Sequence, residues 1–375
     1  MAGIYLHIPF CKTRCIYCDF YSTTRDDLKR RYVRALCREL TLRRDYLQGA
    51  VVETVYLGGG TPSQLAEEDL ADIFRTLQEA YGLDNATEIT LEANPDDLTG
   101  DYVRMLRRFP INRLSMGIQT FDEDTLKLLR RRHTARQAMD AFLRCREAGF
   151  DNLSIDLIYG LPGETDARWQ ADLQQAVRLR PEHVSAYHLM YEEETTLYRY
   201  LLEHRVCEVD EDASVRFYHR LTDTLSEAGY VHYEISNFCL PGRHARHNAS
   251  YWQGIPYLGC GASAHSYDGR SREWNVASIE AYMQGMERGE RPHEVECLDA
   301  DTRYNEYVMT GLRTRWGISL DQVAADYGKE RLAYLERMAR PHLQRGMMAV
   351  GEGRLRLTEA GVFVSDDILS DLMYV

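Results

Sequence analysis

Residues 3–18 read GIYLHIPFCKTRCIYC, a short apolar run that is followed at once by three cysteines. β-Branched and aromatic residues dominate GIYLHI, which is the composition of a strand. Cys11, Cys15 and Cys18 then follow with the spacing C-x3-C-x2-C. This stretch therefore predicts a first strand that delivers three thiols to a single loop.

Five further runs of this kind follow, and helical patterns with apolar residues at every third or fourth position separate them. Repeated strand–helix units predict an α/β fold, and six of them predict a partial (β/α)6 barrel of the TIM type rather than a closed eightfold one. Because working residues gather at the carboxyl ends of parallel strands, we expect the motifs at these ends to face one cavity. The five runs are ETVYLGG (53–59), EITLEAN (88–94), RLSMGIQ (113–119), LSIDLIYG (153–160) and HVSAYHLM (183–190).

The alternation ends near residue 190, and helical patterns dominate from residue 276. A chain of 375 residues also exceeds the size that one hydrophobic core usually serves. We therefore expect the barrel with its C-terminal extension over residues 1–275, and a smaller, mainly helical domain over residues 276–375. We expect the Gly-rich passage 241–275 to be a functional loop, and the GEG turn at 351–353 to join a small hairpin that a helix follows.

Composition and charge exclude several classes of protein. The formal net charge of −13 argues against a nucleic-acid partner, which would need a basic face. No stretch approaches the roughly 18 uncharged apolar residues that a membrane span needs, so we expect membrane contact to be peripheral at most. The first residues lack the basic start and long apolar run of a signal peptide, which predicts a cytoplasmic location.

The three clustered cysteines indicate metal ligation. Cubane iron–sulfur clusters take one cysteine thiolate per iron, so three cysteines leave one iron open to a small ligand. The alternative is zinc, but structural zinc usually takes four ligands in paired spacings, and no second CxxC occurs. The other six cysteines are scattered, and we expect them to be buried small hydrophobic residues.

Several motifs occur here in a fixed order: YLHIPFC, GGGTP, EANP, GIQ and IDLIYGLPGE. Together with the cysteine spacing, they resemble the radical S-adenosylmethionine (SAM) family that includes oxygen-independent coproporphyrinogen III oxidase, over essentially the whole chain. The resemblance implies a [4Fe-4S] cluster on Cys11, Cys15 and Cys18 whose open iron is chelated by SAM. It also implies that an electron from the cluster cleaves SAM to a 5′-deoxyadenosyl radical, while the protein supplies orientation and electrostatics.

The same resemblance implies a set of SAM-contacting residues. The GGGTP turn offers backbone N–H groups with no side chain in the way. Glu92 and Asp156, at strand ends, can accept hydrogen bonds from ribose hydroxyls or the SAM ammonium, although without the resemblance either is equally well a satisfied polar residue. The implied set is Tyr5, Tyr17, Gly59, Gly60, Thr61, Glu92, Gln119, Arg131, Asp156, Met190 and His265.

One position separates two branches of that family. In the oxidase branch a further cysteine stands two positions after the third, whereas this chain reads Cys18-Asp19-Phe20. The chain also starts only a few residues before its first strand, so we expect no counterpart of the N-terminal extension that the oxidase branch uses near its substrate. Both departures resemble the HemW-type branch of haem chaperones and put decarboxylase activity in doubt.

Residues 247–252 read HNASYW and fit the HNxxYW motif of the HemW-type branch, which is linked to haem binding. A neutral imidazole is a common axial ligand of haem iron, and aromatic rings pack well against a porphyrin. His244, Arg243 and Arg246 lie nearby, and a guanidinium suits a propionate. A lone histidine beside a tryptophan is more often a hydrogen-bonded loop residue, so both interpretations stay open. The expected haem-binding set is His247, Asn248, Tyr251 and Trp252.

The leading hypothesis is a haem chaperone that binds haem, carries the cluster and SAM, and passes haem to acceptor proteins, with respiratory proteins as one candidate class. The alternative is an enzyme, either coproporphyrinogen III oxidase or another radical SAM enzyme that acts on a porphyrin. A third hypothesis is a zinc-stabilised barrel with no redox role. Whether the protein turns over a substrate is therefore left open by the sequence.

Overall fold

The computed structural model describes residues 1–375 and contains a twelve-stranded sheet and a three-stranded sheet. Six strands pair in parallel and in chain order at the centre of the larger sheet, and all six lie where the sequence predicts them. The first and last of them do not pair with each other, so the barrel is incomplete, as predicted. They are β1 (Ala2–Ile8), β2 (Val52–Gly59), β3 (Glu88–Ala93), β4 (Arg113–Gln119), β5 (Leu153–Tyr159) and β6 (His183–His188).

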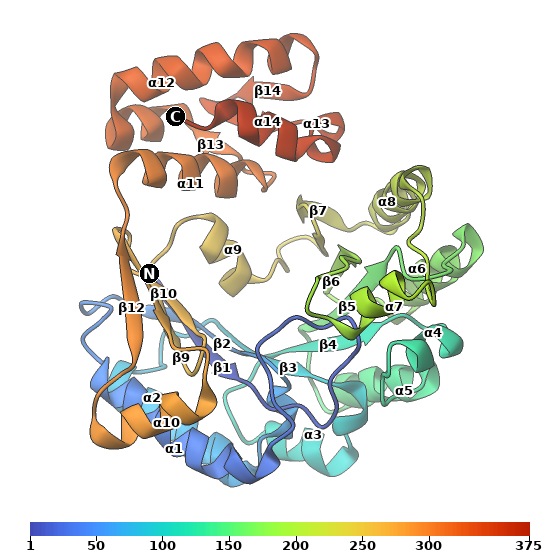
Figure 1. Cartoon of the computed structure of the whole chain (residues 1–375), viewed down its shortest axis with the longest axis vertical. Coiled ribbons are helices and arrows are strands. Elements are labelled where there is room, and N and C mark those ends of the chain that lie inside the picture. Colours follow the sequence, from blue (N-terminus) through green and yellow to red (C-terminus); the bar gives the residue numbers. More distant parts are fainter.

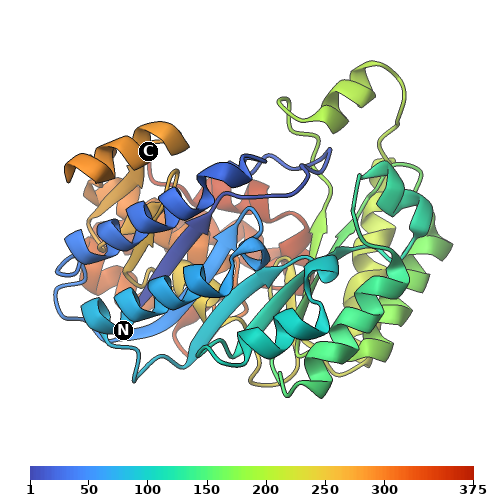
Figure 2. The same ribbon diagram turned by 90° about the horizontal axis from the view of Figure 1, so that it is seen from below.

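Helices connect these strands and cover the outer face of the curved sheet (Figure 2). Alternate strand residues such as Leu114, Met116 and Ile118 are fully buried in the core on that face. The α-helices are α1 (Lys29–Leu42), α2 (Glu67–Tyr81), α3 (Gly100–Leu106), α4 (Glu123–Leu128), α5 (Ala135–Glu147) and α6 (Asp166–Leu179), with 3-10 turns at η1 (Asp26–Leu28), η2 (Pro62–Gln64) and η3 (Pro95–Asp97).

The inner face of the barrel is polar. Successive side chains of a strand point to opposite faces, so the residues between the core positions point into the barrel. Buried parallel strands are usually apolar on both faces. Here the inward residues of the first five strands are mostly polar: Tyr5 and His7 on β1, Thr54 and Tyr56 on β2, Glu88, Thr90 and Glu92 on β3, Arg113 and Ser115 on β4, and Ser154 and Asp156 on β5. Such an interior is built to receive a polar ligand rather than to pack.

Short strands extend the sheet at both edges. Beyond β6 lie β8 (Asn237–Cys239) and β7 (Val231–Glu234), after α7 (Thr196–Leu202) and α8 (Glu211–Glu227). Beside β1 lies β9 (Tyr257–Cys260), a further parallel strand, followed by β10 (His265–Tyr267), β11 (Ser271–Asn275) and β12 (His293–Cys297). The prediction of a loop over residues 241–275 was therefore wrong, because this passage contains α9 (Arg246–Trp252) and three strands. These strands have only three to five residues, and β9 pairs with the distant β1, so they leave no local periodic signal.

The C-terminal unit has a hydrophobic core of its own. The predicted hairpin at 351–353 is present, and helices follow it. The elements are α11 (Ala300–Leu312), β13 (Ile318–Ser319), α12 (Leu320–Gln344), which is broken at Gly328, β14 (Met348–Gly351), β15 (Arg354–Leu357), α13 (Glu359–Phe363) and α14 (Ser365–Leu372). Figure 1 shows this unit above the concave side of the barrel, with α9 between them.

The predicted boundary at residue 275 lies within elements that pack on the barrel. β12 is part of the large sheet, and α10 (Ile279–Arg288) packs against α1, where Arg31 Nε lies 2.6 Å from Glu287 Oε1. We therefore propose a boundary near Leu298. None of the helices combines the length and the apolar character that crossing a membrane would require.

Candidate cofactor site

The three clustered cysteines lie on a loop that folds back on the end of β1. The backbone N–H of Cys11 donates to the Thr23 carbonyl at 2.9 Å, and the Thr23 N–H donates to the Pro9 carbonyl at 2.7 Å. All three thiols are half-buried. The prediction that the other cysteines are buried holds for Cys145, Cys239 and Cys260, whereas Cys37 is half-buried and Cys207 and Cys297 are exposed. Cys297 ends the edge strand HEVEC, whose residues are all exposed.

A chain of hydrogen bonds joins two of the thiols. Thr61 Oγ1 donates to Cys11 Sγ at 3.3 Å, and Asn94 Nδ2 donates to Thr61 Oγ1 at 3.4 Å. The Arg131 guanidinium donates to Asn94 Oδ1 at 2.6 Å and to Cys15 Sγ at 3.3 Å. Donors aimed at sulfur stabilise thiolates and orient them. Residues from the ends of β2 and β3 and from the loop after α4 therefore hold the cysteine loop.

This donor set fits a cluster with one open iron. It provides three thiols, and each iron of a cubane needs one. No group of three or more His, Cys, Asp or Glu side chains converges as the ligands of a single metal ion must. Burial raises the pKa of the Cys11 thiol and raises that of Cys18 to about 11, so iron must displace protons from both when it binds.

The GGGTP turn packs tightly against the end of β1. The Gly60 N–H donates to the Ile8 carbonyl at 2.9 Å. A Cβ on Gly60 would lie 2.7 Å from the Ile8 carbonyl oxygen, and one on Gly59 would lie 2.5 Å from the His7 ring. Gly59 also has a φ of 104°, which favours glycine. Only glycine allows this approach, so the turn is fixed beside the cysteine loop.

Two carboxyl groups face the barrel interior from β3 and β5. Glu92 accepts hydrogen bonds from the Tyr56 hydroxyl at 2.7 Å and from the Gly59 N–H at 3.1 Å. Asp156 accepts one from the Ser115 hydroxyl at 3.3 Å. Burial raises the pKa of Glu92 to about 7 and also raises the pKa of Asp156. Both carboxyl groups belong to the set that the sequence predicts to contact SAM, and that role stays a prediction.

Gln119, Tyr5 and Tyr17 belong to the same region, whereas two other predicted residues stand apart. Gln119 has a φ of 74° at a register shift between β4 and β5, and such strain is typical of functional sites. The Tyr5 hydroxyl hydrogen-bonds His7 Nδ1 at 3.1 Å, and Tyr17 packs in the cysteine loop. Met190, 68% exposed, and His265, exposed and stacked on Trp274, form no hydrogen bond with this group.

Sequence reasoning missed three residues of this region. His7 donates from Nε2 to the Tyr21 carbonyl at 2.9 Å, so it ties the far end of the cysteine loop to β1. Asn94 bridges Thr61 and Arg131. Arg113 is 1% exposed inside the barrel. His7 and Asn94 stand within motifs that the sequence had already marked, and Arg113 opens an alternating apolar strand, where a charge is unusual.

Helix α9 carries the HNASYW residues and closes the amino-terminal end of the barrel. His247 is 0% exposed, and its two ring nitrogens hydrogen-bond Thr54 Oγ1 and the Tyr251 hydroxyl, each at 2.8 Å. Its ring stacks on Tyr56 at a centroid distance of 5.2 Å. Burial lowers the pKa of His247 to about 3, so the imidazole is neutral. The buried Glu88 carboxylate accepts the N–H groups of Arg246 and His247, both at 2.9 Å, and thereby caps the helix.

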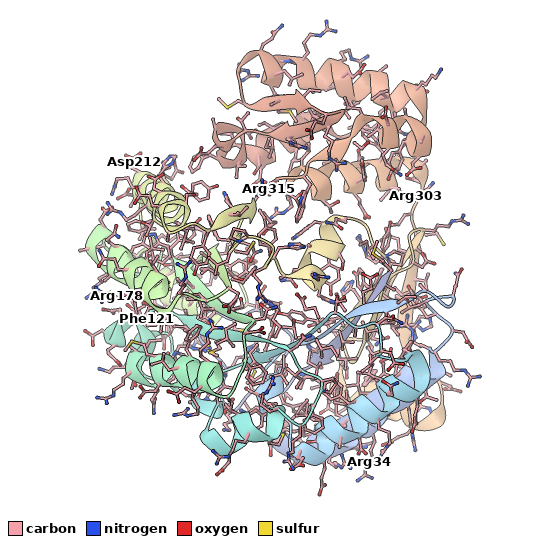
Figure 3. All side chains as sticks on the ribbon, turned by 180° about the vertical axis from the view of Figure 1, so that it is seen from behind. Arg34, Phe121, Arg178, Asp212, Arg303 and Arg315 are labelled. Atoms are coloured by element: carbon pink, nitrogen blue, oxygen red, sulfur yellow. The ribbon has the colours of Figure 1, made fainter.

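The opposite side of α9 meets the C-terminal unit. The Arg313 guanidinium lies 5.0 Å from the centre of the Trp252 ring and 3.3 Å from Glu234. Arg315 lies at the boundary between barrel and C-terminal unit (Figure 3). Close by, the half-buried His244 ring is 5.5 Å from that of Trp316 and forms no hydrogen bond. Half-buried aromatic residues and arginines thus gather on this side.

Comparison with known proteins shows the family of the chain. A sequence model of the Radical SAM superfamily matches residues 5–176, and one of the HemN C-terminal domain matches residues 298–364. The chain is 32% identical to "Heme chaperone HemW" of Bacillus subtilis over 98% of either chain. It is 35% identical to the protein of the same name from Mycobacterium tuberculosis over 99% of this chain and 94% of the relative. The chain belongs to the HemW family.

The fold of this HemW-family protein also occurs in a solved enzyme. The structure of coproporphyrinogen III oxidase (HemN) from Escherichia coli, described as a radical SAM enzyme, has a TM-score of 0.85 and matches 99% of this chain and 90% of the enzyme. The identity is 23%, so this likeness concerns the fold alone. The HemW-family chain therefore combines a radical SAM barrel with a HemN-type C-terminal unit, as the sequence predicted.

Proposed function

We propose that the protein is a haem chaperone, which binds haem and passes it to acceptor proteins. The observation that carries this proposal is the near full-length similarity to two bacterial proteins named haem chaperones. The residues after the cysteine loop support it, because Asp19 and Phe20 replace the segment in which the oxidase branch has its further cysteine. The Phe20 side chain is 62% exposed and ligates nothing.

The proposal includes a [4Fe-4S] cluster on Cys11, Cys15 and Cys18, with SAM on the open iron. When bound, this pair supplies one-electron chemistry. The protein's own part is positional: the bridge from Thr61 through Asn94 to Arg131 orients two thiolates, and Gly59 and Gly60 let the GGGTP turn pack directly against the end of β1. Replacing Cys15 with Ser should abolish cluster assembly, whereas Cys207→Ser should leave the iron content unchanged. A full iron complement in the Cys15 variant would contradict the assignment.

Haem binding is proposed at the HNASYW helix. Trp252 and Tyr251 offer aromatic surface, and Asn248 is half-buried beside them. His247 ligates iron only if it gives up a hydrogen bond, because both of its nitrogens are engaged. His244 has no such bond to break. The axial ligand is therefore one of two histidines on the same segment.

A haem titration of histidine variants tests this site. We expect His247→Ala or His244→Ala to weaken haem binding about tenfold or more with unchanged iron–sulfur content. The exposed His204 provides the matched control, and His204→Ala should bind haem like the wild type. Wild-type affinity in both the His247 and the His244 variants would remove the histidine ligand from the proposal.

The alternative function is enzymatic. It is tested because the chain shares its fold with coproporphyrinogen III oxidase. Anaerobically reconstituted protein is incubated with SAM, a reductant and coproporphyrinogen III, and the products are analysed for vinyl groups. We expect none, together with transfer of bound haem to an apo-acceptor. Vinyl-bearing product at many turnovers would overturn the chaperone proposal. The respiratory nature of the acceptors, a peripheral membrane contact and a cytoplasmic location stay predictions.

A further inference from the structure

Arg113 is a charged side chain sealed inside the barrel. It opens β4 and points inward, because its neighbours Leu114 and Met116 alternate onto the helix-covered face. It is among the largest fully buried side chains of the chain, at 1% exposure. Arginine is almost never buried so completely unless it is paired.

The guanidinium of Arg113 has no bonded partner. Its Nε and Nη1 atoms are buried and make no hydrogen bond, and the residue forms no ion pair. The residue beside it on β3, Thr90, also has a buried hydroxyl without a partner. Nothing in the barrel therefore neutralises this charge through direct contact, although a buried charge without compensation is costly.

The groups around Arg113 explain what the charge acts on. The positive charge of Arg113 lowers the pKa of two carboxyls, those of Glu92 and Asp156. Burial raises the pKa of both and is the larger effect. The Glu92 carboxyl also faces four phenols, those of Tyr5, Tyr56, Tyr187 and Tyr251. The Asp156 carboxyl also faces Tyr56, Ser115, Ser185, Tyr187 and Arg131. The other neighbours of Arg113 are the imidazoles of His183 and His247 and the phenols of Tyr56 and Tyr233, all of them neutral groups. Arg113 and Arg131 are thus the cations that act on these two carboxyls, and only Arg113 acts on both.

We propose that Arg113 is a positioning residue, whose fixed positive charge balances the Glu92 and Asp156 carboxylates so that both can receive the cationic ligand SAM. This inference rests on the SAM site of the proposed function. Two neighbouring carboxylates repel each other in a medium of low dielectric constant, and one tends to take up a proton. A cation held between the strands, without bonding either carboxylate, leaves their oxygens free to accept hydrogen bonds from a ligand.

SAM binding across a pH series tests this role. The dissociation constant of SAM is measured for reconstituted wild type, Arg113→Gln and Arg113→Lys from about pH 6 to about pH 9, with iron content and thermal unfolding as checks of integrity. In the wild type, we expect affinity to rise through about pH 7, as Glu92 ionises. In Arg113→Gln the midpoint should move up by about one unit or more, which weakens SAM binding about fivefold or more at pH 7. Arg113→Lys should restore most of the wild-type profile.

Two controls separate a charge effect from damage to the barrel. Glu92→Gln should abolish the pH-dependent step with either residue at position 113, since it removes the titrating group. 5′-Methylthioadenosine, a neutral probe with the same ribose, should lose much less affinity than SAM in Arg113→Gln. The titration of SAM itself is common to all variants and cancels in the comparison.

The outcomes are distinguishable. A loss of SAM affinity that is equal at every pH, equal for the neutral probe, and not rescued by lysine would show a structural role and overturn the proposal. If Arg113→Gln does not fold, the profile of Arg113→Lys decides: a wild-type midpoint supports a charge role, and a displaced midpoint contradicts it. If the wild type itself binds no SAM, the SAM site of the proposed function fails and this role with it.

Discussion

At the scale of single residues, Gly60 sets the distance between the GGGTP turn and the cysteine loop. A methyl group there would press on the Ile8 carbonyl oxygen at 2.7 Å and on the Phe10 N–H at 2.8 Å, both of them backbone atoms that cannot move aside. We expect Gly60→Ala to reduce the free energy of unfolding by about 1–3 kcal/mol and to lower cluster occupancy. Urea unfolding and iron analysis measure both effects.

Gly351→Ala is the matched control, because nothing lies within 4 Å of a Cβ at that position. It should change stability by less than about 0.5 kcal/mol. Equal stability and equal iron content in the two variants would show that the turn does not depend on the close approach of Gly60.

Glu92 makes stability depend on pH. Burial raises its pKa from 4.5 to about 7, so the folded protein holds this proton more tightly than the unfolded chain. The stability that the group contributes is present below pH 4.5 and is lost as pH rises through about 7. Replacing Glu92 with Gln removes the titration, so we expect the variant to gain about 1–3 kcal/mol relative to the wild type between about pH 5 and about pH 8.

Urea unfolding at the two pH values measures this difference. Glu227, whose side chain is exposed, is the control, and Glu227→Gln should show no such gain. A parallel pH dependence of wild type and Glu92→Gln would contradict the buried, protonated state of Glu92.

What the sequence reveals at this scale depends on whether a residue acts alone or through partners. Most residues implied by the resemblance gather at the carboxyl ends of the strands, yet their assignment as SAM ligands stays a prediction. His7 and Asn94 act through hydrogen bonds to loop residues elsewhere in the chain, and Arg113 acts through its charge on carboxyls of neighbouring strands. Such contacts exist only after folding, so spacing alone does not predict them.

At the scale of elements, Glu88 on β3 holds the start of α9. Its carboxylate accepts two N–H groups at the helix start, where the helix dipole also favours a negative charge. We expect Glu88→Gln to lower the free energy of unfolding by about 1–3 kcal/mol and to speed amide exchange within α9, because a neutral amide with one acceptor oxygen replaces it. Hydrogen exchange followed by mass spectrometry resolves α9 from the barrel.

Glu211, exposed in the first turn of α8, is the control for this change. Its replacement by Gln should alter stability by less than about 0.5 kcal/mol and leave exchange in α9 unchanged. Unchanged exchange in the Glu88 variant would mean that the contacts of His247 alone keep the helix in place.

Whether an element was predicted from the sequence depends on its length and on where its partners lie in the chain. The six strands of the barrel repeat with helices between them, and each was predicted from its own residues. α9 and β9 to β11 were missed, since each has only three to seven residues. β9 pairs with the distant β1, β10 and β11 pair with neighbouring short strands, and α9 packs on β2 and α11. The hydrophobic pattern of a segment predicts its structure well where the same element repeats along the chain. It predicts poorly where contacts with a distant segment decide the conformation.

At the scale of the whole molecule, the two proposed ligand sites lie at opposite ends of one barrel. The candidate SAM residues gather where β1 to β5 end, and α9 lies against early residues of β1 and β2, between the barrel and the C-terminal unit (Figure 1). Tyr56 joins the two ends, because its hydroxyl bonds Glu92 and its ring stacks on His247. We therefore expect the two ligands to occupy separate spaces.

This arrangement predicts that SAM and haem bind at the same time. Each ligand at about one hundred times its dissociation constant should stabilise the protein by about 2.7 kcal/mol, and both together by about twice that amount. Thermal unfolding of reconstituted protein with either ligand, with both and with neither measures the sum. Competition, seen as stabilisation by both that equals stabilisation by one, would mean that haem enters the barrel from the cluster side, and the HNASYW helix would then lose its proposed role. The stabilisation by both ligands together can also differ from the sum of the two single stabilisations. If it differs in the wild type but not in Tyr56→Phe, the Tyr56 hydroxyl couples the two sites.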